Sequence, residues 1–218
     1  MSITIINTVD TFTNTRYNLS TENTKEKIMA KIKWRGGALL SPVPPAMVTC
    51  SHEGHDNVIT IAWTGILNTQ PPKTYISVRP TRHSYKMIKE SGCFVINLTT
   101  KDLVRQADWC GVYTGAKVDK FARCNLTKES ANDVDCVMLA DSPLSLECKV
   151  TDVIPLGSHD MFIADIVAVD VDEKLLDEKG KLHLERAGLA AYAHGDYFEL
   201  GKKIGNFGFS VAKKKKKK

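Results

Sequence analysis

The chain of 218 residues is long enough for one well-buried domain and too short for two full domains. Its content of 43% hydrophobic and 25% charged residues is ordinary for a soluble globular protein. No apolar run reaches the length of a membrane span, and the first residues lack the basic start and the apolar core of a secretory signal. We therefore expect a cytoplasmic protein without a membrane partner.

The net charge of +5 comes from one end of the chain. The lysine tail, residues 213–218, contributes six positive charges, so the net charge falls from +5 to −1 once that tail is left out. A chain body without excess positive charge has no uniform basic face for nucleic acid. We expect the tail to be a solvated terminus and predict no nucleic-acid partner.

The six cysteines are far apart and form no C-x-x-C pair. Without a secretory signal, this pattern predicts reduced thiols rather than disulfides. One cluster of possible metal ligands comprises Cys50, His52, Glu53, His55 and Asp56. A tight turn seldom points so many side chains at one ion, so we favour a solvated turn and predict no metal site.

Residues 1–28 are rich in Thr, Asn and Ser and have few large apolar side chains, which predicts a flexible N-terminal extension. The domain is expected over residues 29–212. Within it, short apolar segments at 46–50 and 57–62 flank a polar turn and predict a hairpin. Further strands are expected at 74–78, 93–98, 145–154 and 161–171.

Two of these strands have features of a barrel. The apolar phase of 145–154 slips at Asp152–Val153, as at a β-bulge. The segment 161–171 is apolar on both faces up to Ala168, which suits a barrel wall covered by a helix or by a second subunit.

Helices are expected at 84–91, with Ser84 as N-cap and Gly92 just past the end, and at 103–110. Thr99 or Thr100 would cap the second helix, and Gly111 would end it. At least six strands with only a few helices predict a mainly β fold of the α+β kind, a β-barrel with helical decoration.

Several common catalytic motifs are absent. There is no G-x-G-x-x-G for a Rossmann site and no G-x-S-x-G for a hydrolase. Ser158 and His159 are adjacent on a predicted hairpin, which is not the geometry of a nucleophile elbow.

Two strand ends together have the chemistry of a ligand site. The first, 60–64, runs into a loop at 65–73, and the second, 77–84, runs into a helix start. A helix N-terminus offers free backbone N–H groups and a positive dipole end. A phosphate monoester is predicted to bind the hydroxyl and guanidinium donors of Ser77, Thr81, Ser84, Arg79 and Arg82. Taken alone, 77–84 would favour a well-capped helix with two surface arginines instead.

The sequence resembles the flavin-reductase-like family of FMN-binding split β-barrels, and within it looks most similar to the flavoredoxin group. The resemblance covers residues 34–210. It rests on the order and spacing of the segments 57–64, 71–72, 77–80 with 84–85, 94–98, 119–122, 146–148, 157–163, 197–205 and 207–210.

The resemblance implies a split-barrel homodimer with FMN near the subunit interface. It places the isoalloxazine ring against Thr60, Ile61, Ala62, Trp63 and Thr64. The remaining cofactor-binding positions implied are Ser77, Val78, Arg79, Thr81, Arg82, Ser84, Asn97 and Lys120. Asn97 would reach the ribityl chain or the ring.

Three of the implied site residues need comment. His159 would be the catalytic residue, facing the flavin or nicotinamide, although a turn histidine bonded to a backbone carbonyl is an equal alternative. Trp63 is expected to shape the site rather than stack on the ring. Lys120 would contact the phosphate or else pair with Asp119, and the first is slightly favoured.

The resemblance further implies an oxidoreductase that transfers hydride from NAD(P)H, as co-substrate, to FMN and electrons onward to a flavin, a small acceptor or a redox partner protein. The alternative is a flavoredoxin-type electron-transfer flavoprotein that holds FMN tightly and has no direct NAD(P)H turnover.

Overall fold

The computed structural model describes residues 31–212, so the predictions for the extension at 1–28 and for the lysine tail lie outside the described residues. The chain divides into two units, Met1–Ala38 and Leu39–Lys218. Of the first unit, residues 31–38 are described and have no regular secondary structure. The second unit contains every helix and strand that the structure describes.

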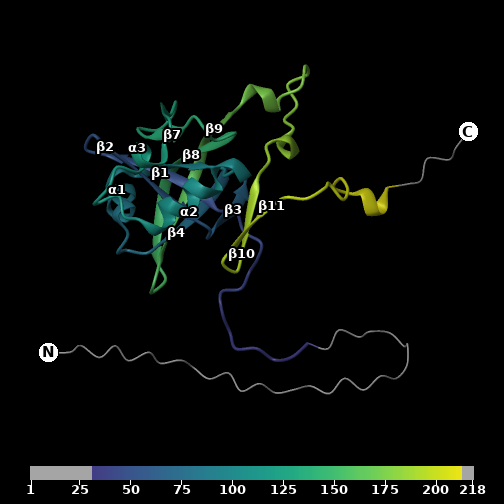
Figure 1. Cartoon of the computed structure of the whole chain (residues 1–218), viewed down its shortest axis with the longest axis horizontal. Coiled ribbons are helices and arrows are strands. Elements are labelled where there is room, and N and C mark those ends of the chain that lie inside the picture. The colour runs from purple at the N-terminus through teal and green to yellow at the C-terminus, as the bar shows by residue number, and fades with distance from the viewer. Residues whose placement is uncertain (1–30, 213–218) are drawn as a thin grey trace, which may run out of the picture. The chain divides into compact units, whose positions relative to one another are not determined.

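Seven strands of this unit form one antiparallel sheet in the order β2-β1-β5-β8-β9-β4-β3 (Figure 1). They are β1 (Ala46–His52), β2 (His55–Ile61), β3 (Thr64–Thr69), β4 (Pro72–Val78), β5 (Cys93–Asn97), β8 (Leu144–Pro155) and β9 (Asp160–Val171). Two small antiparallel hairpins accompany the sheet: β6 (Lys128–Ser130) with β7 (Val137–Leu139), and β10 (Ala190–Ala193) with β11 (Asp196–Glu199).

The sheet must curl because its two edge strands are neighbours in the sequence. Strand β2 forms one edge and β3 the other, yet only Ala62 and Trp63 separate them. At this junction the N–H of Ser77 on β4 donates to the carbonyl of Trp63 at 3.0 Å. Edges joined at one end and apart elsewhere describe a split barrel, the predicted fold.

The helices cover β1 and β2. They are α1 (His83–Ser91), α2 (Val104–Val112) and α3 (Lys120–Cys124), with short 3₁₀ turns at Lys101–Leu103, Glu173–Leu175, Leu184–Arg186 and Phe209–Val211. Helix α1 packs mainly against β1, and α2 against β2. None of the helices in the described part of the chain is long and apolar enough to cross a membrane.

Strand β1 is buried on both faces because core side chains lie on either side of it. On one face Val48 packs in a cluster with Phe94 and with Ile88 of α1. On the other face Met47 packs with residues of α2 and α3, including Phe121. Successive side chains of β1 point to opposite faces and therefore pack against different helices. This packing holds α1, α2 and α3 near the ends of β2 and β4.

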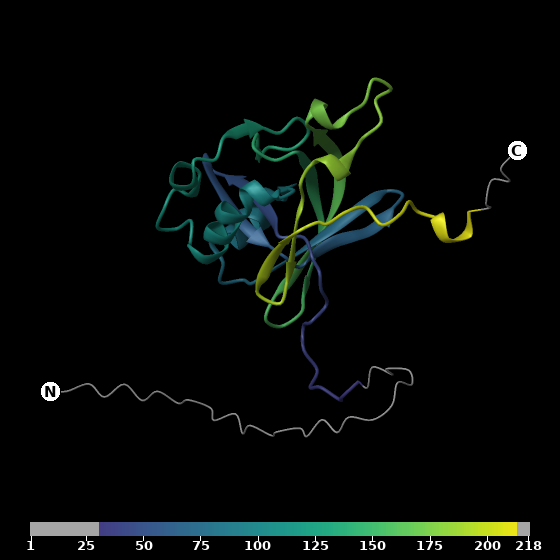
Figure 2. The same cartoon turned by 45° about the vertical axis from the view of Figure 1, so that its right-hand side comes forward.

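The β10–β11 hairpin lies beside the large sheet in both views (Figure 1, Figure 2). Val43 and Tyr192 exchange two backbone hydrogen bonds of 2.9 and 2.8 Å, which tie the hairpin to the segment before β1. Its two-residue turn has His194 at φ 51° and Gly195 at φ 102°, the positive values that a tight hairpin turn of this kind requires.

Most predicted strands and the first helix are confirmed. The hairpin β1–β2, the strands β4, β5, β8 and β9 and the helix α1, with Gly92 in a left-handed C-cap at φ 71°, lie where the sequence predicts them. The predicted bulge is confirmed to within a residue, because the register of β8 against β9 shifts between Val150 and Asp152.

Other predictions are wrong. The expected loop 65–73 forms most of β3 and the start of β4, because an exposed edge strand needs no alternating apolar pattern. Ser84 is not the N-cap of α1: Arg82 occupies that position, without a side-chain cap. Likewise Thr100 makes no side-chain cap, and the helix starting after it runs through Gly111 to Val112.

Strand β9 is not buried on both faces within this chain. Val167 is 39% exposed and Val169 is 51% exposed. No element of residues 39–212 covers these side chains enough to bury them. The strand has two apolar faces, and the residues that the structure describes bury one of them.

Candidate functional site

A cleft opens where β2 and β4 end. It consists of two adjoining cavities of about 310 and 210 Å³, which share Ile59, Arg79, Arg82 and Gly111 in their walls. Together they fall in the size range of small-molecule and cofactor sites. The larger cavity is lined by the ends of β2 and β4, by α2 and by the β10–β11 hairpin, and the smaller by the start of α1 and the segment 110–120.

The smaller cavity is strongly cationic. Arg79, Arg82 and Lys120 all line it, and none of the three forms an ion pair within residues 31–212. Positive charges converging on one cavity without a carboxylate repel one another, so the arrangement is stabilised by an anion.

Lys120 is the most unusual of these cations. Its residue is only 3% exposed, and its Nζ donates to the backbone carbonyls of Val58 and Cys110 at 2.7 Å each. Burial lowers the pKa of Lys120. The predicted alternative, pairing with Asp119, is wrong because the Asp119 side chain instead accepts from the Ala122 N–H and caps α3. An ammonium group has three N–H donors, so one remains for a ligand.

The start of α1 adds neutral donors. The first N–H groups of a helix, here those of His83 and Ser84, have no acceptor within the helix. Ser84 is completely buried, and its Oγ accepts from Nδ2 of Asn57 at 2.8 Å. Asn57 in turn lies over Gly115, where an added Cβ would come within 2.2 Å of the Asn57 Oδ1. Glycine at this position therefore allows the contact that fixes Ser84.

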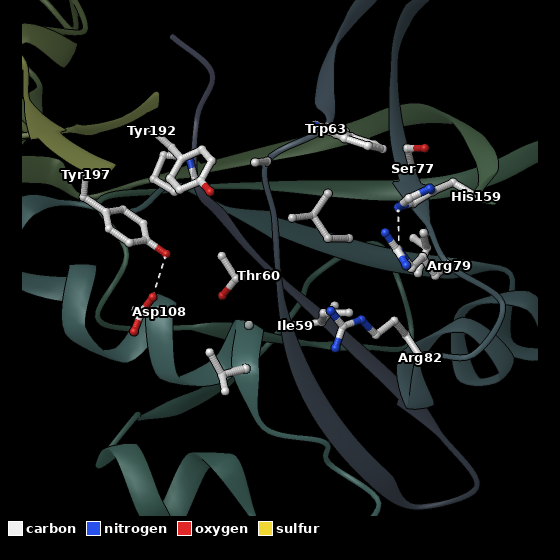
Figure 3. A pocket seen from close by; sticks show the side chains of 16 residues that line it. Ile59, Thr60, Trp63, Ser77, Arg79, Arg82, Asp108, His159, Tyr192 and Tyr197 are labelled. Atoms are coloured by element: carbon white, nitrogen blue, oxygen red, sulfur yellow. Dashed lines mark hydrogen bonds between the residues drawn. The ribbon is translucent and has the colours of Figure 1, made fainter. Parts of the chain in front are cut away.

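The larger cavity is flatter and more apolar. Ile59, Ile61 and Val78 contribute aliphatic surface, and the backbone of 60–63 runs along the wall. The hydroxyl of Thr60 donates to the Ala107 carbonyl, which holds β2 against α2. Figure 3 shows Thr60 between two aromatic ends, with Tyr192 and Tyr197 at one end and Trp63 and His159 at the other.

The contacts of His159 decide which of its ring nitrogens accepts a hydrogen bond. Its Nε2 lies 3.3 Å from the Nε of Arg79 (Figure 3), and its Nδ1 lies 2.9 Å from the hydroxyl of Ser158. Burial lowers the pKa of His159, and Arg79 and Arg82 lower it further. Because a guanidinium can only donate, Nε2 accepts, so neutral His159 carries its proton on Nδ1. The ring also packs on Trp63 with centroids 4.6 Å apart.

Tyr197 closes the opposite end of the larger cavity. Its hydroxyl donates to Oδ1 of Asp108 on α2 at 3.2 Å, and Tyr192 packs edge-on against it with ring centroids 5.2 Å apart (Figure 3). Burial and the Asp108 carboxylate raise the pKa of Tyr197 to about 12, so the phenol stays protonated. Sequence reasoning missed Asp108, Tyr192 and Tyr197. The signal was the pair of tyrosines flanking His194-Gly195, a turn typical of a two-residue hairpin.

Most of the predicted site residues line this cleft. Those in the larger cavity are Thr60, Ile61, Ala62, Trp63, Ser77, Val78, Arg79, Arg82 and His159. Those in the smaller cavity are Arg79, Thr81, Arg82, Ser84 and Lys120.

Ser77 lines only the larger of the two cavities, and the predicted placements of Thr64 and Asn97 are wrong. Thr64 lines neither, because its hydroxyl donates to the Tyr75 carbonyl at 2.6 Å and fastens β3 to β4. Asn97 is completely buried: its Nδ2 donates to the Met47 carbonyl at 2.9 Å, and its Oδ1 accepts from the Leu139 N–H at 2.9 Å. Its polar atoms join strands and cannot reach the cleft.

A third cavity, of about 690 Å³, lies next to the cationic one and is a weaker candidate. Its lining carries charges of both signs, and two pairs form there: Lys128 with Asp56 at 2.9 Å and His52 with Glu90 at 3.0 Å. Within residues 31–212, no three His, Cys, Asp or Glu side chains are grouped so that they could hold a metal ion.

The fold and cleft can now be compared with known proteins. A family model described as "Flavin reductase like domain" matches residues 39–201. The chain belongs to this family. The match covers every strand and helix that lines the cleft, so the two cavities belong to the flavin reductase-like domain itself.

Known structures agree with this membership. Flavoredoxin of Desulfovibrio vulgaris (Miyazaki F) superposes with a TM-score of 0.79 at 28% identity, covering 84% of this chain and all of that one. An FMN-binding protein of Thermus thermophilus, solved with bound 1-cyclohex-2-enone, superposes with a TM-score of 0.70 at 24% identity, covering 81% of this chain and 99% of that one. The second similarity shows the fold.

Among curated proteins, an uncharacterised protein of Aeropyrum pernix is 30% identical over 132 residues. The aligned segment is 60% of this flavin reductase-like chain and 50% of the Aeropyrum protein. The chain therefore spans about half the length of that relative.

Proposed function

We propose that the chain binds FMN in the two-part cleft and acts as an NAD(P)H-linked oxidoreductase. The observation that supports FMN most strongly is the smaller cavity, in which three cations and a helix start converge without a carboxylate partner. A phosphate monoester dianion would satisfy this set of donors. The larger cavity beside it offers apolar wall surface that suits a flavin ring.

In this proposal the protein's own groups divide the work of binding. Arg79 and Arg82 lie between the two cavities and would bind the phosphate from the cleft side, while Lys120 and the N–H groups of His83 and Ser84 would bind it from within. When bound, FMN supplies the transfer of hydride and electrons. The backbone of 60–63 and the Ser77 hydroxyl provide polar groups along the chamber wall for the ring edge.

His159 is proposed to hold the Arg79 guanidinium and to border the ring. Because its Nε2 accepts from Arg79, this nitrogen is not free to take up a proton in this arrangement. Binding and orientation, rather than acid–base catalysis, are thus the chemistry we assign to the side chains of the cleft.

The proposal is tested on freshly purified full-length chain. We expect bound flavin absorption and steady oxidation of NADH or NADPH when free flavin is added. A protein that is free of flavin and cannot be reconstituted would contradict the FMN proposal. The alternative, an electron carrier of the flavoredoxin kind, is favoured by the similarity to the Desulfovibrio protein. It predicts that bound flavin is reduced by a protein electron donor and not by NAD(P)H.

We also propose that the chain forms a homodimer in the cytoplasm, with a redox partner protein as one possible acceptor. Exposed apolar side chains on two strands support a subunit interface. They are Ile66 and Leu67 on β3, and Val167 and Val169 on β9. Light scattering should give about twice the chain mass of 24.2 kDa. Ile66→Asp should shift the protein toward single chains, whereas Ile32→Asp, at an exposed position before the family match at 39–201, should not. A wild-type mass of one chain at micromolar concentration would exclude the dimer.

A further inference from the structure

Two cysteines on neighbouring helices lie close beside the cationic cavity. The Sγ atoms of Cys110 on α2 and Cys124 at the end of α3 are 3.9 Å apart, in van der Waals contact. Cys110 also lines the cavity, and its carbonyl accepts from Lys120, a residue of α3. The structure therefore brings two thiols from separate elements to one place at the edge of the proposed phosphate site.

We propose that Cys110 and Cys124 form a reversible disulfide that fastens α2 to α3. An S–S bond is about 2.05 Å long, so the sulfurs need to approach by roughly 2 Å. Cys124 is at the last residue of its short helix, where Asn125 follows in a left-handed conformation at φ 51°. The end of a five-residue helix can make this adjustment more easily than the middle of the sheet.

The two thiols differ in access, which gives the reaction an order. Cys124 is half-buried and reachable from solvent, whereas Cys110 is completely buried. Burial, with Cys124 as neighbour, raises the pKa of Cys110 to about 12, so its thiol stays protonated and reacts poorly with dissolved oxidants. The first oxidation thus falls on Cys124.

With a hydroperoxide as oxidant, the steps balance. The Cys124 sulfur attacks the peroxide, the O–O bond breaks, and Cys124 becomes a sulfenic acid as one water is released from hydrogen peroxide. The Cys110 sulfur then attacks the Cys124 sulfur, the S–O bond breaks, and the Cys110 proton leaves with the hydroxyl group as a second water. Two thiols and one peroxide give one disulfide and two waters.

The bond would close a loop around the smaller cavity. Residues 111–123 include Gly111, Tyr113, Thr114 and Gly115, which line that cavity, together with Lys120. A bond between the two ends of this segment reduces the conformational freedom of the unfolded chain and holds the segment in place in the folded one. We expect oxidation to raise the Tm by about 6 to 12 °C, the effect of closing a loop of this length in a domain of this size.

Peptide mapping of the folded chain tests the proposal without reference to flavin binding. After treatment with hydrogen peroxide, or with diamide as a second thiol oxidant, trypsin digestion without reductant should yield peptide 106–117 linked to peptide 124–128. The linked pair should be lighter than its two parts by two hydrogens and should disappear with dithiothreitol. Cys124→Ser should abolish it, and the matched Cys93→Ser, a buried thiol whose Sγ donates to the Asp135 carbonyl, should not.

Two results would overturn the inference. One is a folded, oxidant-treated chain in which Cys124 carries sulfinic or sulfonic acid and no linked pair forms. The other is a folded, oxidant-treated chain in which both cysteine peptides are recovered as unlinked thiols. Neither result depends on whether FMN binds, so a failure here leaves the proposed function standing.

Discussion

Arg82→Met should weaken FMN binding about ten- to a hundredfold and leave riboflavin binding nearly unchanged. A hydrogen bond to a charged group contributes ~1.5–3 kcal/mol, and riboflavin lacks the phosphate that would accept it. The substitution is clean because Arg82 makes no ion pair and no side-chain cap in the described structure, so its removal leaves no other group unpaired. Titration of the apoprotein with each flavin measures the two affinities.

Arg105→Met is the matched control. Arg105 is an exposed arginine on α2 that lines neither cavity, so both flavin affinities should stay at the wild-type value. Equal loss of FMN and riboflavin in Arg82→Met would contradict the phosphate assignment, because it would mean that Arg82 acts on the ring or on the fold.

Glu147→Gln should lower the free energy of unfolding by about 2–4 kcal/mol. Glu147 on β8 is completely buried, and its carboxylate accepts from the N–H groups of Asn132, Asp133 and Val134 at 2.7, 2.6 and 3.0 Å. A glutamine keeps the shape but presents an amide nitrogen that cannot accept, so at least one of these backbone N–H groups loses its partner. The Tm should fall by about 5 to 15 °C.

The way in which the stability of the fold changes in acid is a second measure of the role of Glu147. Burial acts to raise the pKa of Glu147, but the three N–H donors and Asp170 hold it below its ordinary value. The stabilisation that ionised Glu147 gives the folded chain is therefore fully present above the pKa that Glu147 has in the unfolded chain. It is lost as the pH falls through the pKa that Glu147 has in the folded chain. Burial and Glu147 raise the pKa of Asp170, so its contribution has the opposite sign and is lost as the pH rises through its folded value.

Thermal melts of Glu147→Gln and of the exposed control Glu173→Gln, at neutral pH and in acid, measure both effects. The Glu147 variant should lose stability at neutral pH and show a weaker acid dependence than wild type. An unchanged neutral Tm would show that the segment 132–134 does not need its carboxylate acceptor.

The parts of the site that could be predicted are those in which function and local sequence coincide. The run from β4 into α1 places Arg79, Thr81 and Arg82 within a few residues, so hydroxyl and guanidinium donors are visible beside a helix start. Trp63 follows a buried strand, and strand ends commonly line sites. Because these features are local, their placement in the cleft follows from the sequence.

Long-range pairing decided the rest. Asn97 ends a strand in the same way as the site residues, but the register of β5 between β1 and β8 turns its amide toward Met47 and Ser145. Tyr192 and Tyr197 enter the cleft only because a distant hairpin packs near α2, with Tyr197 lying 89 residues beyond Asp108. No local periodicity encodes either outcome.

The strands show the same division. Buried strands such as β5 are recognisable from continuous apolar residues, whereas β3 pairs on one side only and leaves Ile66 and Leu67 exposed. Packing within the described residues does not explain why the exposed side chains of β3 and β9 are apolar. They follow from whatever covers those faces, which we propose to be a second copy.

The location of the phosphate in a crystal of the FMN complex tests the central claim most directly. We predict the phosphorus in the smaller cavity, with its oxygens within hydrogen-bond distance of Arg79 or Arg82, of Lys120 Nζ and of the His83 or Ser84 N–H. A phosphate located in the 690 Å³ cavity beside Lys128, or an FMN bound with its phosphate in solvent and the three cations free, would contradict it.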